Sequence, residues 1–295
     1  MTARACLLLL LVLGRALPAA ATERPPIIGV AHIAFRVSDV AKARAFYSGL
    51  LGYDELDHAG DAAHPARVRF EVNERQHIEV VPVLTPDQDE RLVRVAFETT
   101  DVATLRAYLA EKGFPVDPPF MDGADSVLRT RDPDGHVVDF VQYLVPVSSR
   151  SHRIATPGPQ RVSARILHVG LSVRDPAAAD RFYKDVLGFS EIWRGGRDDT
   201  RTDWINMKVP DGTEYLEYML TGAEPLDRAR LGSMHHVALV VPDIQKALET
   251  VRSRPGGWDR QAVRNPQVGR NRRWQLNLFD PDGSRAELME PYTMR

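Results

Sequence analysis

One type of segment occurs four times along the chain and constrains the fold more than any other feature. Each copy is an apolar run that predicts a strand, followed by an aspartate that predicts a helix cap. A histidine stands at the matching place in three copies, as His32, His168 and His236, and Arg94 takes that place in the other. The copies recur every 60 to 75 residues, so we expect a fold made of repeated units. They occupy residues 30–39, 92–101, 165–175 and 234–243.

Each repeat continues with a helical pattern and then three short strand-like runs. One such module has a sheet with one face covered by its helix, and the other face needs a partner. We therefore predict an α+β fold in which four βαβββ modules pair into two domains. The predicted domains are residues 29–145 and 165–292, joined by a linker at 146–164 that is rich in Ser, Pro, Arg and Gly.

The N-terminus predicts export. Arg4 precedes an apolar run at residues 7–13, and small residues follow up to Ala21, so we expect a signal peptide over residues 1–21 with cleavage near Ala21. The run is too short to span a bilayer. The only cysteine, Cys6, would be lost with the signal, which leaves a secreted or periplasmic chain without disulfides.

Composition narrows the partners. Hydrophobic residues make up 43% and charged residues 26% of the chain, and the net charge is −2. These values are typical of a globular protein and favour neither a nucleic-acid nor a membrane surface after signal cleavage. Two paired modules form a curved sheet whose concave face we call a cup. A chain with four repeats can complete its own cups, so we expect a monomer or a homodimer that binds a small molecule.

Alternation along the strands predicts which face of the sheet each repeated histidine lies on. Val169 and Leu171 are bulky and belong against the helix, so His168 and Gly170 lie on the opposite face. By the same parity His236 faces away from the helix in the fourth repeat, and the neighbouring His235 points to the other side. Each histidine thus has a small residue beside it, which predicts open space next to the imidazole.

Carboxylates stand between apolar neighbours in the last strand of every repeat: Glu79, Asp139, Glu217 and Glu287. An isolated carboxylate is costly to bury unless it is paired or binds a metal. The C-terminal half therefore offers His168, Glu217, His236 and Glu287 on one concave surface, a set that suits one divalent ion such as Zn, Ni, Mn or Fe(II).

The N-terminal half offers His32, Glu79, Arg94 and Asp139 at the matching places. Arg94 cannot ligate a metal and its charge would repel one, so we interpret this half as a degenerate copy. Aromatic and polar residues near the C-terminal cup, for which packing or solvation is the commoner role, could also shape the pocket: Arg201, Trp204, Asn206, Tyr215 and Trp274.

Several segments resemble the vicinal oxygen chelate superfamily, which includes glyoxalases, epimerases, extradiol dioxygenases and bleomycin-resistance proteins. The resemblance is carried by LHVGLSVRD (167–175), RFYKDVLGF (181–189), DPDGSRAELME (280–290) and RAFYSGLLGY (44–53). It covers residues 29–291 and implies two glyoxalase/bleomycin-resistance/dioxygenase-like domains. Carried over by position, it implies the ligand set His168, Glu217, His236 and Glu287.

A complete set of four ligands is similar to the glyoxalase and epimerase branch, in which Glu217 or Glu287 would move a proton next to a carbonyl. One departure argues against a lactoylglutathione lyase, because Ser172 stands where those enzymes usually carry an arginine for glutathione. Arg36 holds the matching place in the first half. We therefore expect that branch's metal chemistry on another substrate that chelates the metal through vicinal oxygens.

Two alternatives stay open. An extradiol-type Fe(II) dioxygenase would need only His168, His236 and Glu287 as ligands, with Glu217 in another role. A non-catalytic, resistance-type binding protein would use the cup without chemistry. The sequence identifies neither the substrate nor the metal.

Overall fold

The computed structural model describes residues 21–60, 65–114, 116–145, 160–254 and 263–294. Residues 1–20, in the predicted signal peptide, and 146–159, in the predicted linker, lie outside the described part, so both features stay predictions. Among the described residues, no helix is long and apolar enough to cross a membrane.

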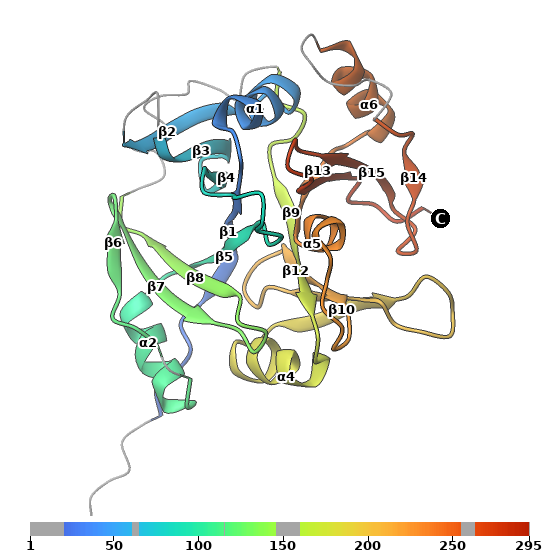
Figure 1. The fold of residues 1–295 in the computed structure, drawn as a ribbon. Coiled ribbons are helices and arrows are strands. Elements are labelled where there is room, and N and C mark those ends of the chain that lie inside the picture. Colours follow the sequence, from blue (N-terminus) through green and yellow to red (C-terminus); the bar gives the residue numbers. More distant parts are fainter. Residues whose placement is uncertain (1–20, 61–64, 115, 146–159, 255–262, 295) are drawn as a thin grey trace, which may run out of the picture.

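The chain forms two mixed sheets of eight strands each, one in each half of the sequence (Figure 1). The strand order is β2-β3-β4-β1-β5-β8-β7-β6 in the first sheet and β10-β11-β12-β9-β13-β16-β15-β14 in the second. The two orders are equivalent, since two βαβββ modules meet through an antiparallel pair of first strands in each sheet. The predicted α+β fold of four paired modules is confirmed.

The N-terminal half contains two modules. The first comprises β1 (Ile27–Arg36), α1 (Val40–Arg44), the π-helical turn η1 (Ala45–Leu50), β2 (Asp54–Gly60), β3 (Pro65–Asn73) and β4 (Gln76–Val81). The second comprises β5 (Leu92–Thr99), α2 (Val102–Glu111), β6 (Phe120–Asp122), β7 (Asp125–Arg131) and β8 (Val137–Tyr143).

The C-terminal half repeats this plan with one addition. The third module comprises β9 (Ile166–Val173), α4 (Pro176–Asp180), the π-helical turn η2 (Arg181–Val186), β10 (Ser190–Gly195), β11 (Trp204–Lys208) and β12 (Tyr215–Leu220). The fourth comprises β13 (His236–Val240), α6 (Ile244–Ser253), β14 (Gln267–Val268), β15 (Trp274–Phe279) and β16 (Arg285–Met289). The extra helix α5 (Arg228–Met234), which the sequence reading missed, leads directly into β13.

The aspartates that follow the first strands cap the helices, as predicted. Asp175 accepts hydrogen bonds from the backbone N–H groups of Ala177 and Ala178, and the equivalent Asp39, Asp101 and Asp243 cap the other modules in the same way. Such caps satisfy N–H groups that have no partner within the helix. They fix where each helix begins and therefore how it lies on its sheet.

The helix-facing side chains of both sheets join one apolar core. Val169, Leu171 and Val173 pack in it with Phe182 and Tyr183, which confirms the predicted parity of this strand. The core crosses between the halves, since the rings of Phe97 and Phe189 pack edge to face with their centroids 5.2 Å apart. The other faces of the two sheets are thereby left to line the cups.

Modules from different halves pack together in two equivalent pairs. The Tyr47 hydroxyl of the first module donates to Asp280 of the fourth at 3.2 Å, and the Tyr183 hydroxyl of the third donates to Asp132 of the second at 3.1 Å. Figure 1 shows the same pairing, with α1 and α6 at one end of the molecule and α2 and α4 at the other. The turns before β8 and β16 are therefore held by the opposite half.

Candidate metal centre

Strand register brings the four predicted residues of the C-terminal half together. Gly170 of β9 is the register partner of both Glu217 on β12 and His236 on β13. Ala238 of β13 is likewise the partner of His168 on β9 and of Glu287 on β16. The four side chains thus project from four adjacent strands onto one face of the sheet, with small residues between them.

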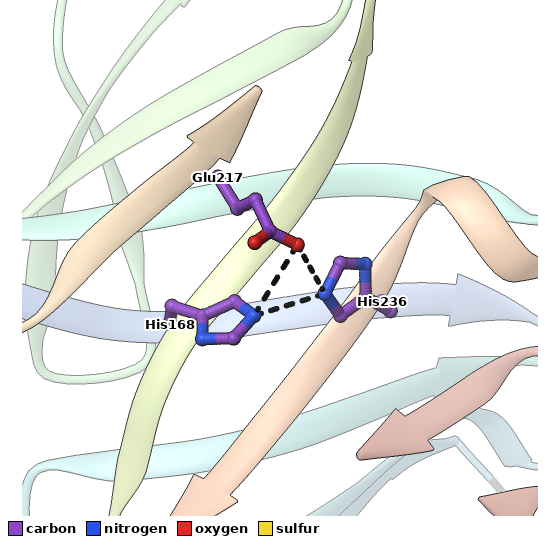
Figure 2. A group of neighbouring side chains, drawn as sticks. All are labelled: His168, Glu217 and His236. Carbon is purple, nitrogen blue, oxygen red and sulfur yellow. Dashed lines mark hydrogen bonds and ion pairs between the residues drawn. The ribbon is translucent and has the colours of Figure 1, made fainter. Parts of the chain in front are cut away.

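The ligand atoms of His168, Glu217 and His236 converge, all within 4.8 Å of one another (Figure 2). The Nε2 atoms of His168 and His236 lie 2.9 Å apart. Glu217 Oε2 lies 3.7 Å from His168 Nε2 and 3.3 Å from His236 Nε2. Glu287 Oε2 lies 3.6 Å and 3.7 Å from the same two atoms. Donor atoms bound at about 2.1 Å around a tetrahedral ion would lie about 3.4 Å apart, so the spacing fits a metal.

The protonation tendencies also fit a cation. Burial lowers the pKa of both imidazoles well below the usual range, so they are neutral and carry lone pairs. Burial raises the pKa of Glu287 to about 7; Arg285 opposes this rise and Glu217 adds to it. All four residues are buried. Two neutral imidazoles and two buried carboxylates form a donor set of the kind that binds a divalent metal, so the residues present fit such an ion.

Helix α5 sets the orientation of His236. The Nδ1 atom of His236 lies 2.9 Å from the carbonyl oxygen of Met234, the last residue of the helix. A proton on Nδ1 donated to that carbonyl leaves the Nε2 lone pair free to bind a metal. The Arg285 Nη2 atom lies 2.8 Å from the same Nδ1. Sequence reasoning missed Arg285, although its place two residues before Glu287 puts both on one strand face.

A cavity of about 400 Å³ opens beside the four side chains. Glu217 and Glu287 line it together with Trp193, Trp204 and Arg285. Of the other residues that the sequence placed near the cup, Tyr215 stacks on His168 at 4.5 Å, Asn206 is buried, Trp274 packs against the core, and Arg201 forms an ion pair with Asp203. The sequence predicts open space beside the His168 imidazole, at Gly170. That prediction is wrong at this position, because the His236 ring fills the space beside Gly170.

In the N-terminal half an arginine takes the place of a metal. The Arg94 guanidinium forms an ion pair with Glu79, lies 3.4 Å from Asp139, and donates to His32 Nε2 at 3.3 Å. Arg129 adds a bidentate pair to Asp139, with both distances 2.7 Å. All three residues that match metal ligands of the other half therefore face a guanidinium, as expected of a degenerate copy.

Two further predicted positions lie outside the convergence point. The His235 ring points away from it, with Nε2 2.7 Å from Ser172 Oγ and Nδ1 3.0 Å from Glu90. The Arg36 guanidinium donates to the backbone carbonyls of Glu90 and Leu92. Ser172 is uncharged, and the Arg36 guanidinium is bound to backbone carbonyls. Neither residue therefore offers an unoccupied cation to an anionic ligand.

A family model described as the Glyoxalase/Bleomycin resistance protein/Dioxygenase superfamily matches residues 29–140 and 165–288. The chain belongs to this superfamily. The match covers both halves of the fold, including the half with Arg94, so both sheets are superfamily domains. The resemblance inferred from the segments quoted above is confirmed.

Individual proteins resemble this chain over different fractions of its length. A lactoylglutathione lyase of Haemophilus influenzae is 30% identical over 127 residues, which is 43% of this chain and 92% of that protein. The 2,3-dioxygenase LapB of Pseudomonas sp. KL28 superposes with a TM-score of 0.65 at 19% identity, covering 92% of this chain and 96% of that one. An extradiol ring-cleaving dioxygenase of B. fuscum gives 0.66 at 21% identity, with 94% and 76% covered.

These likenesses carry different weight. The two dioxygenase structures cover more than nine-tenths of this chain, so they share the fold of both halves. At such identities they show the fold alone. Superfamily membership does not by itself decide between lyase, isomerase and ring-cleavage chemistry.

Proposed function

We propose that this protein is an exported, metal-dependent enzyme of the glyoxalase and epimerase kind, a lyase or isomerase that acts on a small substrate with vicinal oxygens. The observation that carries the proposal is the convergence of His168, Glu217 and His236 beside a cavity, with Glu287 Oε2 within 3.7 Å of both imidazoles. Two imidazoles and two carboxylates are the expected ligands of one Zn, Ni, Mn or Fe(II) ion.

Each group has a part in the proposed reaction. A divalent metal held by the four side chains supplies Lewis acidity for the negative charge that develops on the substrate oxygens. Glu217 and Glu287 both line the cavity, so either carboxylate can take a proton from the carbon next to a carbonyl and return it. Trp193 and Trp204 line the same cavity and limit its access to water.

Extradiol ring cleavage is the second candidate. It is supported by the likeness of the whole chain to two-sheet dioxygenase structures. It would require Fe(II) and three ligands, with Glu217 free for another role. The converging position of Glu217, 3.3 Å from His236, favours the four-ligand proposal.

Metal content is the deciding experiment. Elemental analysis of the mature protein should find about one Zn, Ni, Mn or Fe per chain. The double variant His168→Ala/His236→Ala should lose it. In the other half His77 stacks on His32 with ring centroids 4.5 Å apart, and the matched double variant His32→Ala/His77→Ala should keep the metal. Iron together with oxygen consumption on catechols would favour ring cleavage. Absence of bound metal and of uptake of any of these ions would contradict both enzyme proposals and favour a binding protein.

A further inference from the structure

The side chain of Arg285 lies in the cavity with few partners. Its Nη1 reaches Asn277 Oδ1 only at 3.4 Å, and its Nε is buried without a hydrogen-bond partner among the described residues. No carboxylate of the described part forms an ion pair with it. In contrast, Arg270 at the rim of the same cavity pairs with Asp199. A partly buried guanidinium is normally paired, so Arg285 needs explanation.

Metal binding would remove its remaining partner. Arg285 Nη2 lies 2.8 Å from His236 Nδ1, and it can donate there only if Nδ1 carries no proton. A neutral His236 that binds a metal through Nε2 keeps its proton on Nδ1 and donates it to Met234. The guanidinium then faces another donor, and Nη2 and Nε both lack an acceptor.

The charge of the cavity points the same way. Its charged lining consists of Arg197, Arg270 and Arg285 against Glu217 and Glu287. Arg270 is paired with Asp199 and a divalent metal would balance the two carboxylates, so Arg197 and Arg285 leave an excess of positive charge. Such a lining favours an anionic ligand.

We propose that the substrate carries a carboxylate close to its chelating oxygens and that Arg285 binds this carboxylate. Arginine suits this role because its planar fork can donate two parallel hydrogen bonds to a carboxylate. Arg285 and Glu287 lie two residues apart on one strand face, which is roughly 7 Å along the strand. The anionic group therefore lies next to the metal-binding end of the substrate. This assignment rests on the proposed function, because it needs the metal site.

Hydroxamates provide a direct test, because they chelate divalent ions through two neighbouring oxygens. The probes are acetohydroxamate, succinic monohydroxamate, and the neutral carboxamide of the latter. Their Kd values for the Zn²⁺-loaded full chain are measured by titration calorimetry. We expect the carboxylate probe to bind about 10-fold or more tightly than its carboxamide, a ratio typical of one charge-assisted contact.

Variants assign this preference to one residue. Arg285→Gln should reduce the ratio between the carboxylate and carboxamide probes to about one and leave acetohydroxamate binding within about twofold. Arg285→Lys should keep part of the ratio, since it retains the charge without the planar fork. The control Arg194→Gln removes an exposed arginine of β10, which pairs with Glu191, and should keep the full ratio.

The outcomes separate the two proposals. Failure of acetohydroxamate to bind would contradict the metal site itself and the Arg285 assignment with it. If acetohydroxamate binds but the carboxylate gives no preference, or if the preference survives Arg285→Gln, the substrate assignment is wrong and the metal proposal stands.

Discussion

The imidazole of His236 occupies the space in which residue 170 would carry a side chain. A Cβ built on Gly170 would overlap the Cε1 and Nδ1 atoms of that ring. Glycine is required at this position because the ring lies directly over its backbone. In the other half, the residue equivalent to Gly170 is Ala34, whose register partner is Arg94.

Gly170→Ala should therefore weaken metal binding although it changes no ligand. The added methyl group forces His236 out of the convergence point, and the remaining ligands bind at least about 10-fold more weakly. Metal affinity by chelator competition checks this. The matched control is Gly49→Ala, where the added Cβ would meet only one backbone oxygen at 3.9 Å. Unchanged affinity in Gly170→Ala would show that His236 is not a ligand.

Arg94→Ala should destabilise the fold by about 1–3 kcal/mol, because it removes the nearest cation from buried Glu79 and leaves Arg69, at 3.5 Å, and Arg129 to pair with Glu79 and Asp139. Glu79 and Asp139 are 1% and 2% exposed, and both face Arg94. Urea unfolding measures the loss. Arg194→Ala removes an exposed pair instead and should cost at most about 1 kcal/mol. Equal effects in the two variants would contradict the idea that Arg94 takes the place of a metal.

Asp280 should make the protein more stable as the pH falls from about 6 to 4. Burial raises its pKa to about 6, against about 3.9 for an aspartate in an unfolded chain. Between these values the folded state binds a proton that the unfolded state does not, so the free energy of unfolding rises with falling pH. The contribution is about 2–3 kcal/mol at most.

The variant Asp280→Asn isolates this effect. The asparagine oxygen can still accept hydrogen bonds from the backbone N–H groups of Asp282 and Ser284. The asparagine NH2 group can donate a hydrogen bond to the Tyr47 hydroxyl oxygen. Urea unfolding of both proteins between pH 4 and 7 should show the slope in the wild type and a reduced slope in the variant. The same slope in both would contradict the assignment to Asp280.

Gly232→Ala tests the support of helix α5. Alanine in a helix normally stabilises by up to about 1 kcal/mol relative to glycine. Here the added Cβ would overlap Arg91 of the N-terminal half and the backbone oxygen of Gly283. Because a backbone atom cannot yield cheaply, we expect a net loss of about 1–3 kcal/mol. Thermal unfolding measures it, and a gain in stability would show that α5 is free to shift.

The sequence predicts the modules and the faces of their strands because both depend on short-range periods. Alternation alone put His168 and Glu217 on the same face, and the structure bears this out. It could not show that the two imidazoles meet, since this depends on the register between strands 68 residues apart. It also left an apparent gap at Gly170, which the ring of a distant residue fills.

Other features depend on contacts between the halves and have no local signal. Helix α5 is short and has little apolar periodicity, and it is held by Arg91, a residue of the opposite half. The proposed role of Arg285 likewise rests on the lack of an ion-pair partner among the described residues, which a sequence does not show. The turns that contain Asp132 and Asp280 were predicted, but not the tyrosines that reach them.

The crossed contacts of Tyr47 with Asp280 and of Tyr183 with Asp132 make the two halves interdependent. Each half completes a buried turn of the other, so dividing the chain at the linker would expose apolar and polar groups on both pieces. The N-terminal half is therefore a structural support for the candidate metal centre on the other sheet. A mutation that weakens the N-terminal half can disturb that centre without touching any of its four residues.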